Sequence, residues 1–152
     1  MAKTKSEKLT ASKAATAKSA VPAFAGRYVE GIGRRKTAVA RVRLFKGDGK
    51  VFVEDRSLAE YFQVPRLRDA VMSPFTRLKI DNFDMHAHVN GGGLNSQAEA
   101  IRLGIARALV DGDADLKKQL RALGFMTRDS RAVERKKPGL KKARHAPQWA
   151  KR

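Results

Sequence analysis

The chain contains no cysteine, no long apolar run and few acidic residues. The lack of cysteine excludes a disulfide scaffold, a zinc ribbon and a thiol nucleophile, and it permits a reducing compartment. No apolar run approaches the roughly 18 residues that a membrane span requires. Lysines at positions 3, 5, 8, 13 and 18 interrupt the N-terminus, which therefore lacks the apolar segment of a secretory signal. We expect a soluble intracellular protein without a membrane partner.

The shortage of acidic residues leaves a large positive charge. Thirty-three Lys and Arg stand against fifteen Asp and Glu, a formal net charge of +18. This excess is far beyond what solubility requires, so it predicts a polyanion as partner. A chain of 152 residues with 42% hydrophobic content can form one compact domain with a modest core. It is too short for a large multidomain enzyme.

The charge divides the chain into three parts. Residues 1–26 carry five Lys and one Glu among small residues, which predicts a basic, flexible N-terminal extension. Residues 27–125 carry eighteen basic and twelve acidic side chains and nearly all large apolar residues, so they form the globular core. Residues 126–152 carry ten basic and two acidic side chains, and Pro138, Gly139 and Pro147 interrupt any regular element. We expect this extended basic tail to be disordered in isolation.

Alternating apolar residues predict the strands of the core. Residues 37–46 place Ala40, Val42 and Leu44 on one side, with Arg41 and Arg43 on the other. Glycines at positions 47 and 49 precede a short apolar segment, residues 51–53, which favours a hairpin with the preceding strand. Residues 84–89 alternate again, and residues 28–33 form a shorter, mixed segment.

Capping signals and helical periodicity predict four helices. Ser57 and Glu60 form a capping box, as do Ser96 and Glu99. The predicted helices run from about residue 57 to 62, 66 to 72 (ending before Pro74), 97 to 110, and from about 113 to the glycine at 124. A glycine within the third helix, Gly104, suggests close packing against the sheet. The order of elements indicates an α+β fold, a two-layer α/β arrangement with helices on one face of the sheet.

Three consecutive glycines, residues 91–93, precede the third helix. Such a turn can bring the backbone and a helix N-terminus close to a phosphate. The stretch lacks the Gly-Lys-Ser/Thr ending of a P-loop and is not a dinucleotide fingerprint. A tight structural turn, contact with an RNA phosphate and, least favoured, a nucleotide site remain as interpretations.

The other polar clusters do not indicate catalysis or metal binding. Asp111, Asp113 and Asp115 resemble the start of a calcium loop, but the loop's required glycine and glutamate are missing. His86 and His88 share one strand face, without a carboxylate at a compelling spacing, and are interpreted as facing solvent or RNA. Nothing positively suggests a Ser-His-Asp triad. We expect neither an enzyme nor a cofactor or metal site.

Three motifs together resemble the family of small-subunit ribosomal protein nine, in its bacterial and organellar form. The first is Gly31-Ile32-Gly33-Arg34-Arg35-Lys36-Thr37-Ala38-Val39-Ala40-Arg41-Val42. The second combines Gly91-Gly92-Gly93 and Gln97-Ala98 with Gly104-Ile105-Ala106-Arg107-Ala108-Leu109, and the third is the basic tail from Thr127 to Arg152. Together they span about residues 28–152.

The resemblance implies a structural constituent of the head of the small ribosomal subunit, and so a role in translation. The fold would contain a left-handed β-α-β unit of the kind found in the second domain of ribosomal protein five. Its partners would be small-subunit ribosomal RNA, peptidyl-site transfer RNA and neighbouring ribosomal proteins. A bacterial ribosome is favoured over an organellar one because no Arg precedes Arg27. The alternatives are a small-molecule kinase of the same superfold and a free-standing nucleic-acid chaperone.

Basic side chains are the expected contacts, since Arg pairs bidentately with phosphate and Lys adds salt-dependent affinity. The expected ribosomal RNA contacts are Arg34, Arg35, Lys36, Arg41, Arg43, Arg128, Arg131, Arg135, Lys136, Lys137, Lys141, Lys142 and Arg144. By position, the resemblance assigns the transfer RNA contact to the terminal pair, Lys151 and Arg152. Trp149 or His145 could stack on an exposed base.

Overall fold

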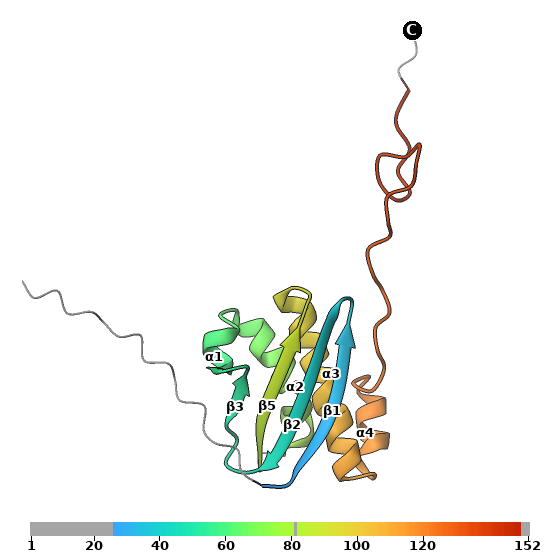
Figure 1. The fold of residues 1–152 in the computed structure, drawn as a ribbon. Coiled ribbons are helices and arrows are strands. Elements are labelled where there is room, and N and C mark those ends of the chain that lie inside the picture. The colour runs from blue at the N-terminus through green and yellow to red at the C-terminus, as the bar shows by residue number, and fades with distance from the viewer. Residues whose placement is uncertain (1–25, 81, 150–152) are drawn as a thin grey trace, which may run out of the picture.

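The sheet and its helices form two layers, from which a long tail leaves (Figure 1). The computed structural model describes residues 26–80 and 82–149, and the predicted N-terminal extension lies outside them except for its last residue. The strands are β1 (Tyr28–Arg35), β2 (Ala38–Lys46), β3 (Val51–Val53), β4 (Arg56–Ser57) and β5 (Phe83–Asn90). The helices are α1 (Leu58–Tyr61), α2 (Pro65–Leu78), α3 (Leu94–Gly112) and α4 (Leu116–Ala122). The expected mixed α+β class is confirmed.

The predicted hairpin between β2 and β3 is wrong, because β5 lies between them. The strand order is β1-β2-β5-β3-β4, with β2 antiparallel and β3 parallel to β5. The loop after β2 joins the start of β5: the Lys50 amide donates to the Asp84 carboxylate at 2.7 Å, and the Met85 amide donates to the Lys50 carbonyl at 2.8 Å. Strand β5 has eight residues and β2 has nine, whereas β3 has three. The longer ladder satisfies more backbone groups.

The prediction that the second helix ends before Pro74 is also wrong. Helix α2 continues through Pro74 to Leu78. Proline has no amide hydrogen, so it cannot donate to the carbonyl of Ala70 one turn earlier. The hydroxyl of Ser73 donates to that carbonyl at 2.8 Å instead. Pro74 itself is buried. Burial and this side-chain hydrogen bond therefore offset a local helix-breaking signal.

Helix ends agree only in part with the predicted caps. Ser57 caps α1 as expected, since its hydroxyl accepts from the Glu60 amide at 3.3 Å. The second capping box is wrong: α3 starts at Leu94, so Ser96 and Glu99 lie inside it, and the N-cap is Gly93. Gly124 follows α4 with a φ of +75°, the left-handed conformation expected of a closing glycine.

Three glycines let α3 cross β1 and β2 at very short range. A Cβ added to Gly33 would lie 1.8 Å from the Ala100 carbonyl oxygen, and one added to Gly31 would lie 2.1 Å from that of Gly104. A Cβ on Gly104 would lie 2.7 Å from a methyl group of Val42. The close packing predicted for Gly104 is confirmed, and the structure adds that β1 supplies the other two glycines.

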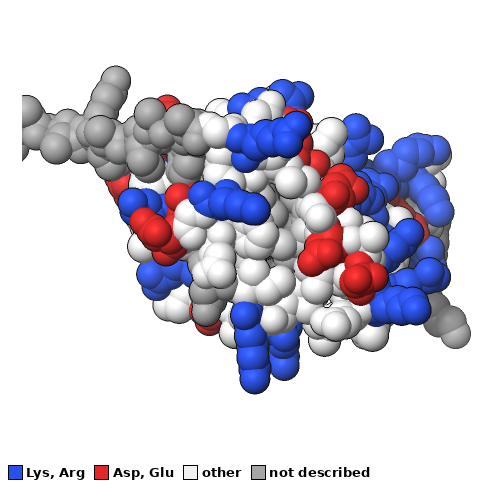
Figure 2. Space-filling model, turned by 90° about the horizontal axis from the view of Figure 1, so that it is seen from below, with Lys and Arg blue, Asp and Glu red and all other residues white. Residues whose placement is uncertain are grey.

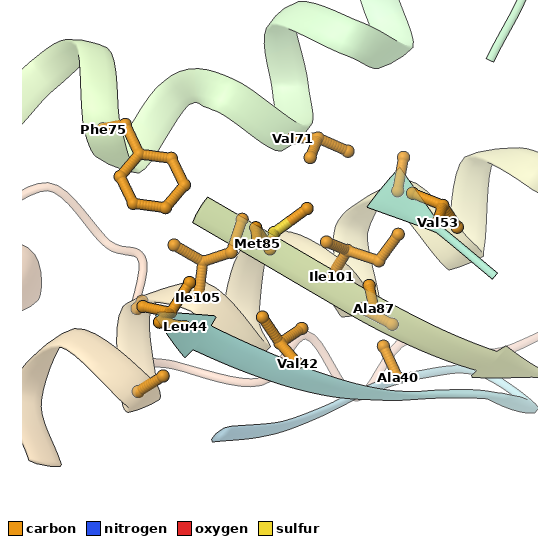
Figure 3. Close-up of a cluster of buried hydrophobic side chains, with 14 of the residues drawn as sticks. Ala40, Val42, Leu44, Val53, Val71, Phe75, Met85, Ala87, Ile101 and Ile105 are labelled. Carbon is orange, nitrogen blue, oxygen red and sulfur yellow. The ribbon is translucent and has the colours of Figure 1, made fainter. Parts of the chain in front are cut away.

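The core lies between one face of the sheet and helices α2 and α3. Ala40, Val42 and Leu44 of β2 and Met85 and Ala87 of β5 line the sheet side, as the alternation predicted. Figure 3 shows Val71 and Phe75 of α2 and Ile101 and Ile105 of α3 on the helix side of this layer. Burying these side chains is the main favourable contribution to folding. The sheet's opposite face is left uncovered by the helices (Figure 1).

Candidate nucleic-acid interface

The turn between β1 and β2 presents two exposed cations. Arg35 pairs with Ala38 across the hairpin, so Lys36 and Thr37 form its two-residue turn. Lys36 adopts a left-handed φ of +51°, as two-residue hairpin turns require. Arg34 and Lys36 are exposed, whereas the Arg35 side chain is only 11% exposed. The predicted cluster is therefore divided into two outward cations and one inward guanidinium.

The glycine turn before α3 packs against this β1–β2 turn. Gly91 and Gly92 have φ values of +71° and +68°. A Cβ on Gly91 would lie 2.8 Å from the Thr37 carbonyl oxygen, and one on Gly92 would lie 2.8 Å from the Ala38 side chain. These contacts support the interpretation as a tight structural turn. They also bring the N-terminus of the 19-residue helix α3 beside the β1–β2 turn, residues 34–37, which we call the basic turn. A helix N-terminus favours negative charge.

On the open face of the sheet, arginine charge is partly neutralised. Arg41 and Arg43 lie on the outer face of β2, as predicted, and both contact the carboxylate of Glu30, at 3.3 and 3.4 Å. The Arg43 guanidinium also lies 5.1 Å from the ring centre of Tyr28, a cation–π distance. The side chain of Arg41 is 58% exposed and that of Arg43 is 31% exposed. Arg41 is therefore the more accessible of the two.

The two histidines on β5 face away from the core, but they are not equally exposed. His86 is half-buried, with its Nε2 atom 2.9 Å from the Glu54 carbonyl oxygen. The Nδ1 atom of His88 lies 3.3 Å from the Glu54 carboxylate. Within residues 26–80 and 82–149, no group of three or more His, Cys, Asp or Glu side chains could hold a metal ion.

The described part of the tail, residues 126–149, contains no helix or strand and extends away from the core (Figure 1). Every predicted contact in it is exposed: Arg128, Arg131, Arg135, Lys136, Lys137, Lys141, Lys142 and Arg144. Trp149 is 89% exposed. The predicted transfer RNA contacts, Lys151 and Arg152, lie outside the described residues.

Two acidic residues organise the tail locally. Glu134 pairs with Arg144 and lies 4.0 Å from Lys137, and the Lys141 amide donates to the His145 carbonyl at 2.7 Å. These contacts close a loop. Hydrogen bonds from Arg131 hold the pKa of the Asp129 carboxyl well below its usual value. The same bonds raise the pKa of Arg131, and those to Glu134 raise that of Arg144.

Arg35 joins the tail to the core. Its Nε donates to the carboxylate of Glu99 on α3, and its Nη2 lies 3.1 Å from the carboxylate of Asp129. Its Nη1 donates to the backbone carbonyls of Asp129 and Arg131. Sequence reasoning missed Glu99 and Asp129 as partners of Arg35. Asp129 stands between Arg128 and Arg131 in the sequence, which was a signal for a local ion pair. Nothing in the sequence paired Glu99 or Asp129 with Arg35 across 64 and 94 residues.

A cleft of about 890 Å³ lies at the opposite end of β1 and β2 from the basic turn. Its lining is mainly apolar and includes Tyr28, Leu44, Phe45, Phe83 and Leu109. Figure 2 shows this end of the molecule, where charged side chains surround a broad uncharged area. Such a lining offers few partners for a phosphate, so the candidate interface consists of the basic turn, the open sheet face and the tail.

None of the described helices combines the length and the apolar character that are needed to cross a membrane. The sequence from residue 33 to residue 152 matches a family model described as ribosomal protein S9/S16. The matched range begins within β1, just before the basic turn, and includes that turn, the glycine turn, α3 and the tail. The resemblance seen in the three sequence motifs is thereby confirmed.

Proposed function

This chain belongs to the ribosomal protein S9/S16 family, and from that premise we propose how it holds its RNA. Members of the family are structural proteins of the small ribosomal subunit that bind ribosomal RNA and act in translation. The proposal is that the basic turn and open sheet face dock the core on ribosomal RNA while the tail threads along it. The observation that carries this proposal is a tail without helix or strand that leaves the core and exposes its cations (Figure 1).

In the core, the proposed contacts are Arg34 and Lys36 on the turn and Arg41 and Arg43 on the sheet. Exposed cations bind phosphate oxygens without giving up interactions inside the protein. Arg41 and Arg43 would exchange the Glu30 carboxylate for an RNA phosphodiester, which carries the same single negative charge, so each contact costs an existing ion pair. We therefore expect the turn to contribute more affinity than the sheet face. Arg35 differs, because its guanidinium already bonds within the protein.

In the tail, the proposed contacts are spaced so that several phosphates are neutralised in succession. They are Arg128, Arg131, Arg135, Lys136, Lys137, Lys141, Lys142 and Arg144, all exposed. Each neutralised phosphate releases counterions, so the logarithm of the binding constant should fall linearly with the logarithm of salt concentration.

A titration of the full chain with a small-subunit ribosomal RNA transcript tests the proposal. We expect a log-log slope of roughly −0.7 to −0.9 per phosphate contact. Changing Arg34 and Lys36 to glutamine should make the slope less negative by about two such increments. As a matched control, Lys117→Gln and Lys118→Gln remove two exposed cations from α4, outside the proposed interface. A wild-type slope near zero, or equal effects of the two double variants, would contradict the proposal.

For the end of the tail we propose contact with peptidyl-site transfer RNA through Lys151 and Arg152. From Arg128 to Arg152 is 25 residues, which extended at roughly 3.3 Å per residue reach about 80 Å. A tail of that reach carries charge to a site that the core does not touch. Earlier tail contacts to ribosomal RNA would hold its path, so the last two cations would arrive with part of their ordering cost already met.

Deleting Lys151 and Arg152 tests this contact. Because a charge-assisted hydrogen bond contributes roughly 1.5–3 kcal/mol before screening, the deletion should weaken transfer RNA binding to purified subunits measurably. Filter binding at the peptidyl site measures the effect. The control, Lys136→Gln with Lys137→Gln, removes the same charge earlier in the tail and should weaken ribosomal RNA binding instead. If transfer RNA affinity is unchanged over a range of salt and magnesium concentrations, the transfer RNA contact is contradicted, and Lys151 and Arg152 bind ribosomal RNA only.

We propose in addition the handedness of the β-α-β unit and the place of the protein in the ribosome. A left-handed β-α-β unit is supported by Figure 1, where β3 and β5 both point upward, the helices lie behind the sheet and β5 lies to the right of β3. Such crossovers are rare, because about 98% are right-handed. We place the protein in the subunit head beside other ribosomal proteins, in a bacterial rather than an organellar ribosome.

Co-sedimentation of the native protein with small subunits in a sucrose gradient separates this proposal from its rivals. A small-molecule kinase would remain at the top of the gradient, and a free nucleic-acid chaperone would spread among RNA species. We expect the protein to sediment with the small subunit at stoichiometric amounts. The family is generally structural rather than enzymatic, and the glycine turn lacks the residues of a P-loop.

A further inference from the structure

One guanidinium connects three segments that are distant in sequence. Arg35 is the last residue of β1, Glu99 lies in the second turn of α3, and Asp129 and Arg131 lie near the start of the tail. The side chain of Arg35 is 11% exposed, and its Nε, Nη1 and Nη2 atoms all contact protein oxygens. Arginine offers five N–H donors in a planar fork. Its hydrogen-bonding capacity is therefore directed almost entirely toward the protein.

We propose that Arg35, Glu99 and Asp129 form a tail-positioning site, which fixes the point and the direction in which the tail leaves the core. The inference rests on the proposed function, in which the tail binds ribosomal RNA. The core on its own holds Arg35 and Glu99, because β1 and α3 meet at Gly33. The tail then docks its residues 129–131 on this preformed pair, using one carboxylate and two backbone carbonyls.

The charges of the site explain why the tail docks here. Arg35 with one carboxylate partner, Glu99, is a balanced ion pair, and the Asp129 carboxylate would add a second negative charge. Arg131 compensates for that charge, since its side chain bonds both oxygens of Asp129 at 3.1 and 2.8 Å. Two cations thus alternate with two carboxylates. A charged network of this kind is more specific in geometry than a single exposed ion pair.

Lysine cannot replace arginine in this role. A lysine ammonium is a compact point charge, whereas the guanidinium fork spans Glu99 on one side and the tail on the other. Arg35→Lys keeps the charge of the basic turn and removes the fork. A direct ribosomal RNA contact by Arg35, the role expected from sequence, would instead depend mainly on charge. The lysine variant separates these two roles.

Because the chain has no cysteine, two spin labels can be attached selectively to test the proposal. One label is placed at Asp69→Cys on α2 and the other at Val133→Cys in the tail, both exposed positions. Double electron–electron resonance on the full chain without RNA measures the width of the distance distribution. We expect a narrow distribution that at least doubles in width in Arg35→Lys and in Asp129→Asn. Arg34→Ala, the exposed neighbour, should leave it unchanged.

The Asp129→Asn variant keeps the test independent of folding, since it changes no residue of the core. Its urea unfolding midpoint should equal that of the wild type while its distance distribution broadens. A distribution that is broad in the wild type, or equally narrow in all variants, overturns the proposal. Binding to the RNA transcript is a separate measurement, and we expect about a tenfold loss when the tail must be ordered on binding. A wild type that fails to bind the transcript contradicts the proposed function and leaves the positioning result standing.

Discussion

Substituting Gly33 by alanine tests whether the close crossing of β1 and α3 holds the core together. The added Cβ would lie 1.8 Å from the Ala100 carbonyl oxygen and 2.6 Å from the Gly104 amide nitrogen. Ordinary contact begins at 3.4 Å, and both neighbours are backbone atoms, so no side chain can rotate away. The strand and the helix must separate along a shared interface. That movement would also disturb the buried layer between Val42 and Ile105.

The expected cost follows from two opposing effects. Overpacking a core typically destabilises by about 1–3 kcal/mol, and a backbone clash places Gly33→Ala at or above the top of that range. Alanine recovers about 0.5–1 kcal/mol, because glycine loses more backbone entropy on folding. We expect a net loss of roughly 2–3 kcal/mol, a large share of the about 5–15 kcal/mol that stabilises a typical domain.

Urea unfolding of the full chain, followed by far-ultraviolet circular dichroism, measures this loss. With a slope of about 1–3 kcal/mol per molar, the midpoint should fall by roughly 1–3 M. Gly104→Ala should cost less, because its nearest atom is a Val42 methyl group at 2.7 Å and alanine favours the helix by about 1 kcal/mol. Gly112→Ala, with only a Val29 methyl group at 3.8 Å, is the matched control and should not destabilise. Equal midpoints for Gly33→Ala and Gly112→Ala would refute the reasoning.

Two further predictions concern the tail. Hydrogen bonds from Arg131 lower the pKa of Asp129. The stabilisation that the ionised Asp129 carboxylate gives to this contact is therefore fully present above the ordinary carboxyl pKa, and it is lost only as pH falls through the lowered pKa. Carboxyl-carbon NMR should show a titration midpoint of Asp129 well below about 3.9, and a midpoint at that value would contradict the contact. Amide exchange of the free protein should be slow in β2, β5 and α3 and fast from residue 136 to residue 149, because only the core buries its backbone. Strong protection in that tail segment without RNA would show that it folds on its own.

Much of the candidate interface could be predicted from sequence because exposure of charge is a local property. The alternation along β2 placed Arg41 and Arg43 opposite the core, and the structure confirms that placement. The tail lacks apolar periodicity, so its cations have no core to join and remain exposed. The family motifs added the identity of the polyanion, which charge alone does not specify.

The sequence by itself determined the fold class, the basic tail and the side of the sheet that carries charge, because periodicity and composition act over a few residues. Only the tertiary structure decided that β5 separates β2 from β3, since strand pairing depends on which ladders can be completed together. It also decided that Pro74 stays inside α2, where Ser73 supplies the missing donor. Above all, it turned Arg35 inward to meet Asp129, 94 residues away. A pair so distant has no periodic signature and forms only when the folded core brings β1, α3 and the tail together.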